Sequence, residues 1–176
     1  GQLPDALLND DISKWILYGL LFLVGIQIGS GKKILLAVKR FGPAIALIPL
    51  ATTVGTFAGA GVSSLLLPGR SLIDCLCVGA GFAYYSLSSI LISEFRGAEL
   101  GTVALLANIM REFIVLLLAP WMVRHFGKLA PICAGGATTM DTTLPIITWY
   151  SGSDYVVVAL FHGMVIDFSV PLWISF

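Results

Sequence analysis

The chain has 176 residues, of which 57% are hydrophobic and 11% are charged, and its mean hydropathy is +0.95. Soluble domains carry about 25% charged residues, so this chain has too few charges to cover a soluble globule. Its 10 basic and 10 acidic residues balance, without the basic surplus that nucleic-acid binders show. The composition therefore predicts an all-α integral membrane protein in a lipid bilayer, and no nucleic-acid partner.

The three cysteines, Cys75, Cys77 and Cys133, lie among apolar or glycine-rich residues. An odd number without paired spacing does not make a disulfide framework, and no histidine follows at the spacing of a zinc site. We interpret all three as small packing residues. We expect no metal and no cofactor.

Two stretches in the first part of the chain have the ~20 mostly apolar residues that a membrane-spanning helix needs. They cover residues 12–28 and 41–67, and the second has no charged residue. The loop between them contains Lys32, Lys33, Lys39 and Arg40. Because loops rich in lysine and arginine stay on the cytoplasmic side, we predict that this loop is cytoplasmic.

The third apolar segment, residues 72–93, is interrupted by the glycines Gly79 and Gly81. If it crosses the membrane fully, which is the simpler alternative, the basic loop at 124–128 lies outside, against the usual distribution of basic residues. If the segment is re-entrant, the same loop lies inside. The sequence leaves both alternatives open.

Two further spans are predicted, over residues 98–123 and 155–175. The stretch between them, residues 130–150, is apolar on average but rich in glycine, threonine and proline. Backbone that is not helical occurs at membrane depth only where protein or water covers it. The sequence thus predicts about five transmembrane helices plus a broken or re-entrant segment at 130–150, in one membrane-embedded domain over 1–176.

The glycine-rich parts of the two irregular segments resemble each other. Residues 77–81 read Cys-Val-Gly-Ala-Gly and residues 133–137 read Cys-Ala-Gly-Gly-Ala, each followed by a run of hydroxyl side chains. Transporters place broken helices at corresponding positions of two repeats. The match is short and each residue type is common, so the sequence leaves open whether it reflects an internal repeat.

Three polar side chains, Asn108, Arg111 and Glu112, stand in the middle of the fourth predicted span, where an ionised group costs at least ~2.5 kcal/mol. Ala104, Asn108 and Glu112 share one helix face. A desolvated carboxyl group can exchange a proton near neutral pH, so we predict that Glu112 belongs to a proton or cation path, with Asn108 and Arg111 beside it. The alternative is a buried ion pair of Arg111 with Glu112 or another acid.

Asp141 is the second candidate for transport or coupling. It lies in the run 135–145, whose hydroxyls and freed backbone groups are expected to line a site; the hydroxyls are those of Thr138, Thr139, Thr142 and Thr143. The exposed ends of half-helices bind charged groups. The alternative is that Asp141 caps a helix that begins at Thr142.

Other polar residues within the predicted spans complete the expected substrate cavity. They are Tyr84, Tyr85, Ser86, Ser88 and Ser89 in the third segment, and Asp167 before Pro171 in the last span. Asp167 is also a possible ion-pair partner of Arg111. His162 is interpreted as a packing histidine with satisfied hydrogen bonds.

Several ordered motifs along the chain resemble the lysine exporter family LysO. They are Gly-Phe-Ala-Tyr-Tyr-Ser-Leu-Ser-Ser at 81–89, Gly-Gly-Ala-Thr-Thr-Met-Asp-Thr-Thr-Leu-Pro at 135–145, the stretch 108–112, and Phe-His-Gly at 161–163. The similarity spans nearly the whole chain. It implies a bacterial inner-membrane carrier that exports L-lysine and its analogues.

Family members are usually longer, with further helices upstream, so the resemblance implies the carboxy-terminal part of a longer or split transporter. Asp167 stands where an acid is not expected in every member. The hypothesis is a multi-pass secondary transporter, an antiporter of L-lysine and a proton or cation, working as a homo-oligomer or with a missing amino-terminal half. The competing hypotheses are an intramembrane aspartyl enzyme using Asp141 and Asp167, and a non-catalytic subunit of a larger membrane complex.

Overall fold

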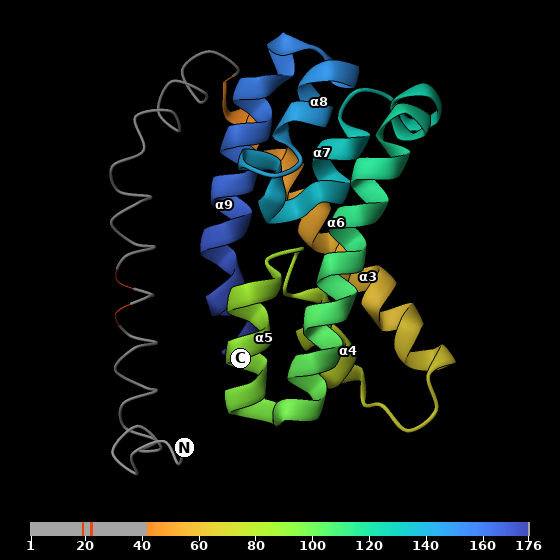
Figure 1. Cartoon of the computed structure of the whole chain (residues 1–176), viewed down its shortest axis with the longest axis vertical. Helices are drawn as coiled ribbons and strands as arrows, with labels where there is room; N and C mark the ends of the chain where they lie inside the picture. The colour runs from red at the N-terminus through yellow and green to blue at the C-terminus, as the bar shows by residue number, and fades with distance from the viewer. Residues whose placement is uncertain (1–18, 20–21, 23–41, 176) are drawn as a thin grey trace, which may run out of the picture. The chain divides into compact units, whose positions relative to one another are not determined.

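The computed structural model describes residues 42–175 together with Gly19 and Phe22 (Figure 1). Apart from Gly19 and Phe22, the span expected at residues 12–28 lies outside the described residues, as does the basic loop of residues 32–40. Residues 42–175 belong to the second of two compact units, Lys32–Phe176. The prediction that one domain covers the whole chain stays a prediction.

Three long helices form the framework of residues 42–175. They are α3 (Leu47–Leu66), α6 (Ala98–Phe126) and α9 (Val156–Ile174). The 3₁₀ turns η2 (Pro43–Ala46) and η4 (Ser153–Tyr155) precede α3 and α9, which gives apolar helices of 24, 29 and 22 residues. At 1.5 Å per residue each can cross a core of about 30 Å. The all-α membrane fold and three of its predicted spans are confirmed.

The segment predicted at 72–93 consists of two short helices that form a hairpin. Helix α4 (Leu72–Gly79) has 8 residues and α5 (Tyr85–Arg96) has 12, so their lengths are about 12 and 18 Å. Between them, Phe82 and Ala83 have positive φ values of 44° and 70°. The two outer ends meet again, because Arg96 at the end of α5 lies 3.7 Å from Asp74 in the first turn of α4.

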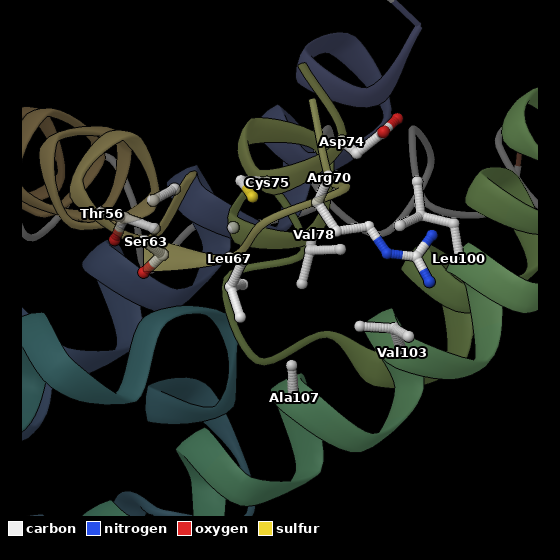
Figure 2. Close-up of a pocket in the computed structure, with 12 residues that line it drawn as sticks. Thr56, Ser63, Leu67, Arg70, Asp74, Cys75, Val78, Leu100, Val103 and Ala107 are labelled. Atoms are coloured by element: carbon white, nitrogen blue, oxygen red, sulfur yellow. The ribbon is translucent and has the colours of Figure 1, made fainter. Parts of the chain in front are cut away.

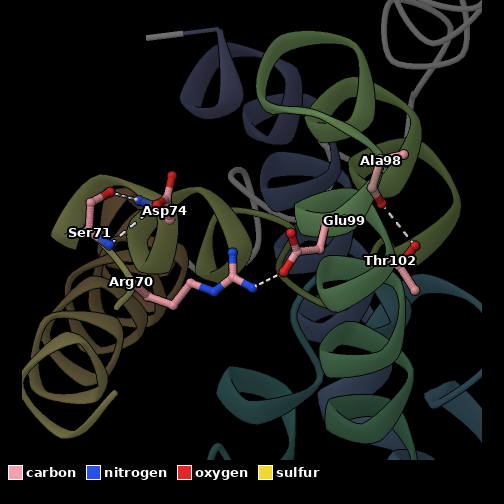
Figure 3. Close-up of polar contacts among 6 residues, drawn as sticks. All are labelled: Arg70, Ser71, Asp74, Ala98, Glu99 and Thr102. Atoms are coloured by element: carbon pink, nitrogen blue, oxygen red, sulfur yellow. Dashed lines mark hydrogen bonds and ion pairs between the residues drawn. The ribbon is translucent and has the colours of Figure 1, made fainter. Parts of the chain in front are cut away.

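This first hairpin, residues 72–96, opens at the end of the framework where α3 ends and α6 begins. There Arg70, in the α3–α4 turn, donates to Glu99 in the first turn of α6 (Figure 3). Helix α4 itself starts with a capping box between Ser71 and Asp74. Residues 72–93 therefore do not cross the whole bundle, and the simpler alternative of a full crossing is wrong. The two helices are half the required length and run in opposite directions, so the segment starts and ends at the same end of the bundle.

A second hairpin, residues 130–151, comprises α7 (Ala130–Gly135), η3 (Gly136–Met140) and α8 (Leu144–Ser151). The break predicted within 130–150 is confirmed. The hairpin opens at the opposite end of the framework, where Lys128, before α7, lies 5.7 Å from the ring of Tyr155, after α8. In Figure 1 the two hairpins accordingly occupy opposite halves of the bundle.

The two hairpins occupy corresponding places in an inverted repeat. Helix α3 is followed by the first hairpin and packs on α4, and α6 is followed by the second hairpin and packs on α7. The paired sequences fall at the same point, because Cys77 and Cys133 each stand two residues before the last residue of α4 and α7, Gly79 and Gly135. The structure thus favours the internal repeat that the sequence left open.

The tips of the two hairpins touch each other in the interior. The backbone N–H of Ala137 donates to the carbonyl of Phe82 at 2.9 Å. Gly136 makes this approach possible, because a Cβ there would lie 2.2 Å from the Phe82 oxygen. Its φ of +61° also lies in the left-handed region, which favours glycine.

The contact between the tips can be tested at Gly136. We expect Gly136→Ala to destabilise the protein by at least ~2 kcal/mol, because the added methyl group forces backbone atoms apart and the φ value is strained. Thermal unfolding of the purified protein in detergent measures the change. Gly59→Ala, in α3, is the matched control, because nothing lies within 4 Å of a Cβ there. Equal melting temperatures for both variants would contradict the tip contact.

Candidate functional site

Asn108 of α6 supplies the hydrogen bonds that the break in the first hairpin needs. Its Oδ1 accepts from the N–H of Ala83 at 2.7 Å, and its Nδ2 donates to the carbonyls of Val78 at 3.2 Å and Ala104 at 2.9 Å. Only 3% of the residue is exposed. Gly81 makes room, since a Cβ there would lie 2.3 Å from Nδ2. Asn108 therefore replaces the helical partners lost where α4 ends.

Arg111, one helical turn further along α6, serves the second hairpin. Its Nε donates to the carbonyl of Ala134 at 2.7 Å and its Nη2 to that of Cys133 at 3.3 Å. These carbonyls belong to the carboxyl end of α7, where the helix dipole is negative and attracts a cation. Nη1 also donates to Thr56 of α3 at 3.3 Å, and the guanidinium lies 5.7 Å from the ring of Phe82.

The alternative of a buried ion pair of Arg111 is therefore wrong for the part of the chain that the structure describes. The ion pairs found within residues 42–175 are Arg70–Glu99 and Arg96–Asp74. Arg111 has neither Glu112 nor Asp167 as a partner. Backbone carbonyls of α7 and a threonine hydroxyl take the place of a carboxylate.

A chain of hydrogen bonds joins α3, α9 and the second hairpin. His162 of α9 contacts the hydroxyl of Thr52 through Nε2 at 2.9 Å and that of Thr139 through Nδ1 at 3.1 Å. The histidine is fully buried and both of its ring nitrogens have partners, as expected for a packing histidine with satisfied hydrogen bonds. The carbonyl oxygens of Gly136 and Ala159 lie 2.8 and 3.0 Å from the Thr139 hydroxyl, and they share its single proton.

Thr138 is buried like Thr139, and its hydroxyl donates to the carbonyl of Gly135 and contacts Thr143. The hydroxyls of Thr138 and Thr139, predicted to line a cavity, thus hold the break of the second hairpin in its bent conformation. Asp141 and Thr142 lie exposed at the tip, where the Asp141 carboxylate accepts from the N–H of Thr142 at 2.6 Å. Helix α8 begins later than expected, at Leu144 with Thr143 as its N-cap, so Asp141 stabilises the turn before it.

Glu112 lies half-buried beside a cavity of about 230 Å³ between α5 and α6. The other lining residues are Tyr85, Ile109, Phe113 and Leu116. Glu112 extends the buried stripe of Ala104 and Asn108, as its spacing predicts. The phenol group and the carboxyl group are the polar side chains that this cavity offers.

The remaining predicted cavity residues lie around the start of α5. Tyr84, at the N-cap of α5, is half-buried, and Ser86 is exposed. Ser88 is buried and Ser89 half-buried, and their hydroxyls donate to the carbonyls of Tyr85 and Ser86. Asp167 of α9 is 4% exposed. Its charge interacts with that of Asp141, and both act on Tyr84, so these three residues gather near the hairpin tips.

A second cavity, of about 490 Å³, lies between α3, α4 and α6 (Figure 2). Its wall is mainly apolar, with Leu67, Val78 and Val103 among the lining residues, and Arg70 and Asp74 stand at the end nearer the hairpin opening. The hydrogen bond and charge of Glu99 raise the pKa of Arg70 above its ordinary value, so the guanidinium stays charged. An apolar wall suits a desolvated cation poorly, which makes this cavity the weaker candidate for a cationic solute.

The comparisons with known proteins address the family of this chain. The family model described as lysine exporter LysO matches residues 1–176. The chain belongs to the lysine exporter LysO family. It is 33% identical over 169 residues to "Lysine exporter LysO" of Escherichia coli (strain K12), an alignment that covers 94% of this chain and 54% of that protein. No solved structure matches.

A second relative of this LysO-family chain is "Putative lysine exporter" of Haemophilus influenzae, 32% identical over 165 residues. That alignment covers 92% of this chain and 82% of the relative. The chain therefore spans about half the length of the Escherichia coli relative and most of the Haemophilus one. The family that the sequence motifs resemble is confirmed.

Sequence reasoning placed Asn108 and Arg111 correctly in the protein interior but missed what they bind. Both side chains contact backbone groups of other segments, 22 to 30 residues away in the sequence. Two features of the sequence could have indicated these partners. Asn108 and Arg111 stand one helical turn apart in a long apolar helix, and the chain has two glycine-rich stretches that interrupt its other helices. Unpaired backbone groups inside a membrane protein require such partners.

The role of Asn108 predicts a large effect on stability. We expect Asn108→Leu to destabilise the protein by about 2–4 kcal/mol, because the buried N–H of Ala83 loses its partner and the carbonyl of Val78 keeps only its bond from the N–H of Gly81. Thermal unfolding in detergent is the measurement. Thr102→Val on the same helix is the control, since Thr102 is exposed and bonds only to the carbonyl of Ala98 one turn earlier (Figure 3). A change below ~0.5 kcal/mol for Asn108→Leu would contradict the assignment.

Proposed function

We propose that this chain is the membrane-embedded core of a carrier that exports L-lysine across the bacterial inner membrane in exchange for a proton or cation. The observation that carries the proposal is the meeting of two broken helical hairpins, which open toward opposite ends of the helix bundle. Transporters bind solutes where such broken helices come together at mid-membrane. The family membership supports lysine as the solute, since both relatives carry that substrate in their names.

The depth of the hairpin tips supports a site near the bilayer centre. Asn108 and Arg111, which hold the tips, stand 10 and 13 residues after Ala98, the first residue of α6. These positions lie about 15 and 20 Å along a helix that crosses a core of about 30 Å. Helices α5 and α8 both begin at this level, so the positive ends of their dipoles suit the carboxylate of an amino acid.

Glu112 is our candidate for the coupling acid. It lies at the same depth as Arg111, which is fully engaged with α7 and Thr56. Within residues 42–175 no basic side chain forms an ion pair with Glu112, and its carboxyl group borders a cavity together with Tyr85. A carboxyl group placed in this way can take up and release a proton, or bind a cation, during transport.

The distribution of basic residues supports one orientation in the membrane. Arg124 and Lys128 lie at the end of the bundle where α3 begins, as the cavity that joins Lys128 to residues 44–48 indicates. The opposite end also has two basic residues, Arg70 and Arg96, so the basic loop at 32–40, which precedes α3 in the chain, decides between the two. By the positive-inside rule we place the end where α3 begins in the cytoplasm. The first hairpin is then re-entrant from outside and the second from the cytoplasm.

The competing hypotheses receive less support. An aspartyl enzyme needs two carboxyl groups that share a proton, whereas Asp141 is exposed at a hairpin tip, Asp167 is buried in α9, and no hydrogen bond joins them in the described part of the chain. A purely structural subunit leaves the cavity beside Glu112 without a role. The homo-oligomer and the missing amino-terminal half stay predictions.

The re-entrant arrangement predicts which positions a membrane-impermeant thiol reagent reaches from outside intact cells. After the three native cysteines are replaced by alanine, Ser71→Cys and Arg96→Cys should both be labelled, because both ends of the first hairpin face outside. Lys128→Cys and Ser153→Cys should react only after permeabilisation. Labelling of position 71 and not 96, or the reverse, would show a full crossing and contradict the arrangement.

The coupling role predicts that Glu112→Gln abolishes lysine export while the protein stays folded and reaches the membrane at wild-type level. The measurement is lysine efflux from cells loaded with a lysine-containing dipeptide, in a host without its own exporter. Removing the exchangeable proton should lower efflux at least ~100-fold, to the background of the host. Glu94→Gln, at an exposed position in α5, should export normally. Normal efflux with Glu112→Gln would refute the coupling role.

A further inference from the structure

Asp167 is a buried acid without a counter-ion in the described part of the chain. The residue is 4% exposed, and none of the hydrogen bonds or ion pairs found within residues 42–175 involves its carboxyl group. Buried carboxylates are normally paired, because desolvation of an unpaired charge costs several kcal/mol. In the described part of the chain, Ser151 has a fully buried side-chain oxygen without a hydrogen-bond partner, and the carboxyl oxygens of Asp167 are not in that class. The Asp167 oxygens therefore keep a small accessible surface. The carboxyl group of Asp167 is thus available to bind a cation that reaches it.

The position of Asp167 on α9 directs it toward the hairpin tips. Gly163, one helical turn earlier on the same face, is packed so closely on the second hairpin that a Cβ would lie 2.7 Å from the N–H nitrogen of Met140. Asp141 follows Met140 in the chain and interacts electrostatically with Asp167. Tyr84, at the tip of the first hairpin, interacts with both acids. Asp167 therefore faces the region where the two hairpins meet.

The basic side chains of residues 42–175 lie elsewhere or are already engaged. Arg124 and His125 are exposed in the last turn of α6, where His125 contacts the carbonyl of Trp121. Arg111 binds the carboxyl end of α7, and Arg70 and Arg96 pair with Glu99 and Asp74 at the open end of the first hairpin. Lys128 lies against Tyr155 at the opposite end of the bundle. His162 uses both ring nitrogens on threonine hydroxyls. A cation for Asp167 has to come from outside this set.

We propose that Asp167 binds the side-chain ammonium group of the transported amino acid and so determines the preference for a cationic substrate. This inference rests on the proposed export of lysine. The α-carboxylate and α-ammonium groups, common to all amino acids, can be held by helix starts and carbonyls at the two breaks. The buried carboxylate of Asp167 then rejects a neutral side chain of the same length, because such a substrate leaves the acid desolvated and unpaired.

The test compares L-lysine with L-norleucine, which has the same chain length but no side-chain ammonium group. Binding of each to the purified, lipid-reconstituted protein is measured by calorimetry, and export of each from dipeptide-loaded cells is measured in parallel. We expect the wild type to prefer lysine at least ~100-fold and Asp167→Asn to reduce this preference at least ~10-fold. Asp154→Asn, at an exposed position in η4, is the control and should keep the wild-type preference.

A second measurement uses the unaltered protein, in case Asp167→Asn does not fold. Hydrophobic carbodiimide modifies buried carboxyl groups, and mass spectrometry locates the modified residue. We expect lysine to protect Asp167 from modification and norleucine at the same concentration to leave it reactive. The inference would be overturned if Asp167→Asn kept the full preference for lysine, or if lysine did not change the modification of Asp167. In either case, lysine export by the wild type would still uphold the proposed function. Absence of lysine binding and export in the wild type would overturn both.

Discussion

The structure depends on one constraint, the need to satisfy backbone groups that two helix breaks leave unpaired in the protein interior. Water is scarce there, so protein side chains have to supply the hydrogen bonds. Asn108 binds both sides of the first break, and Arg111 binds the carbonyls at the second. Because these residues stand one turn apart on α6, a single helix fixes the depth of both hairpin tips. The bond from Ala137 to Phe82 then joins the tips directly.

The inverted repeat explains why the breaks face each other. Helices α3 and α6 run in opposite directions, so the hairpins that follow them open at opposite ends of the bundle. Because both hairpins reach the same depth, their tips meet. Repeats of this kind allow one half to rock against the other around a central site. Within residues 42–175 the first hairpin is held at its open end by ion pairs and the second by hydroxyl groups and His162 at its tip. The two halves are therefore alike in topology but fastened by different chemistry.

Composition and span length were sufficient to predict the membrane class and the long helices, since both follow from the thickness of the bilayer. The composition of residues 130–150 also predicted the break in the second hairpin, whereas for residues 72–93 a full crossing was the simpler alternative. The sequence did not show that residues 72–93 turn back. The average hydropathy of these residues is the same whether they form one continuous span or two short helices. Nor did it show the partners of Arg111: carbonyls of α7 attract a guanidinium as a carboxylate does, but they carry no sequence signature.

The polar side chains of the interior divide into those whose hydrogen bonds are already made and those that remain available. Asn108, Arg111, Thr138, Thr139 and His162 belong to the first group, and changing them should affect folding before it affects selectivity. Glu112 and Asp167 belong to the second within residues 42–175, one beside a cavity and one at the hairpin tips. In the function that we propose, Glu112 is the candidate for coupling and Asp167 the candidate for binding the cationic side chain. The two available acids lie on different helices, α6 and α9, so each function can be removed by mutation without removing the other.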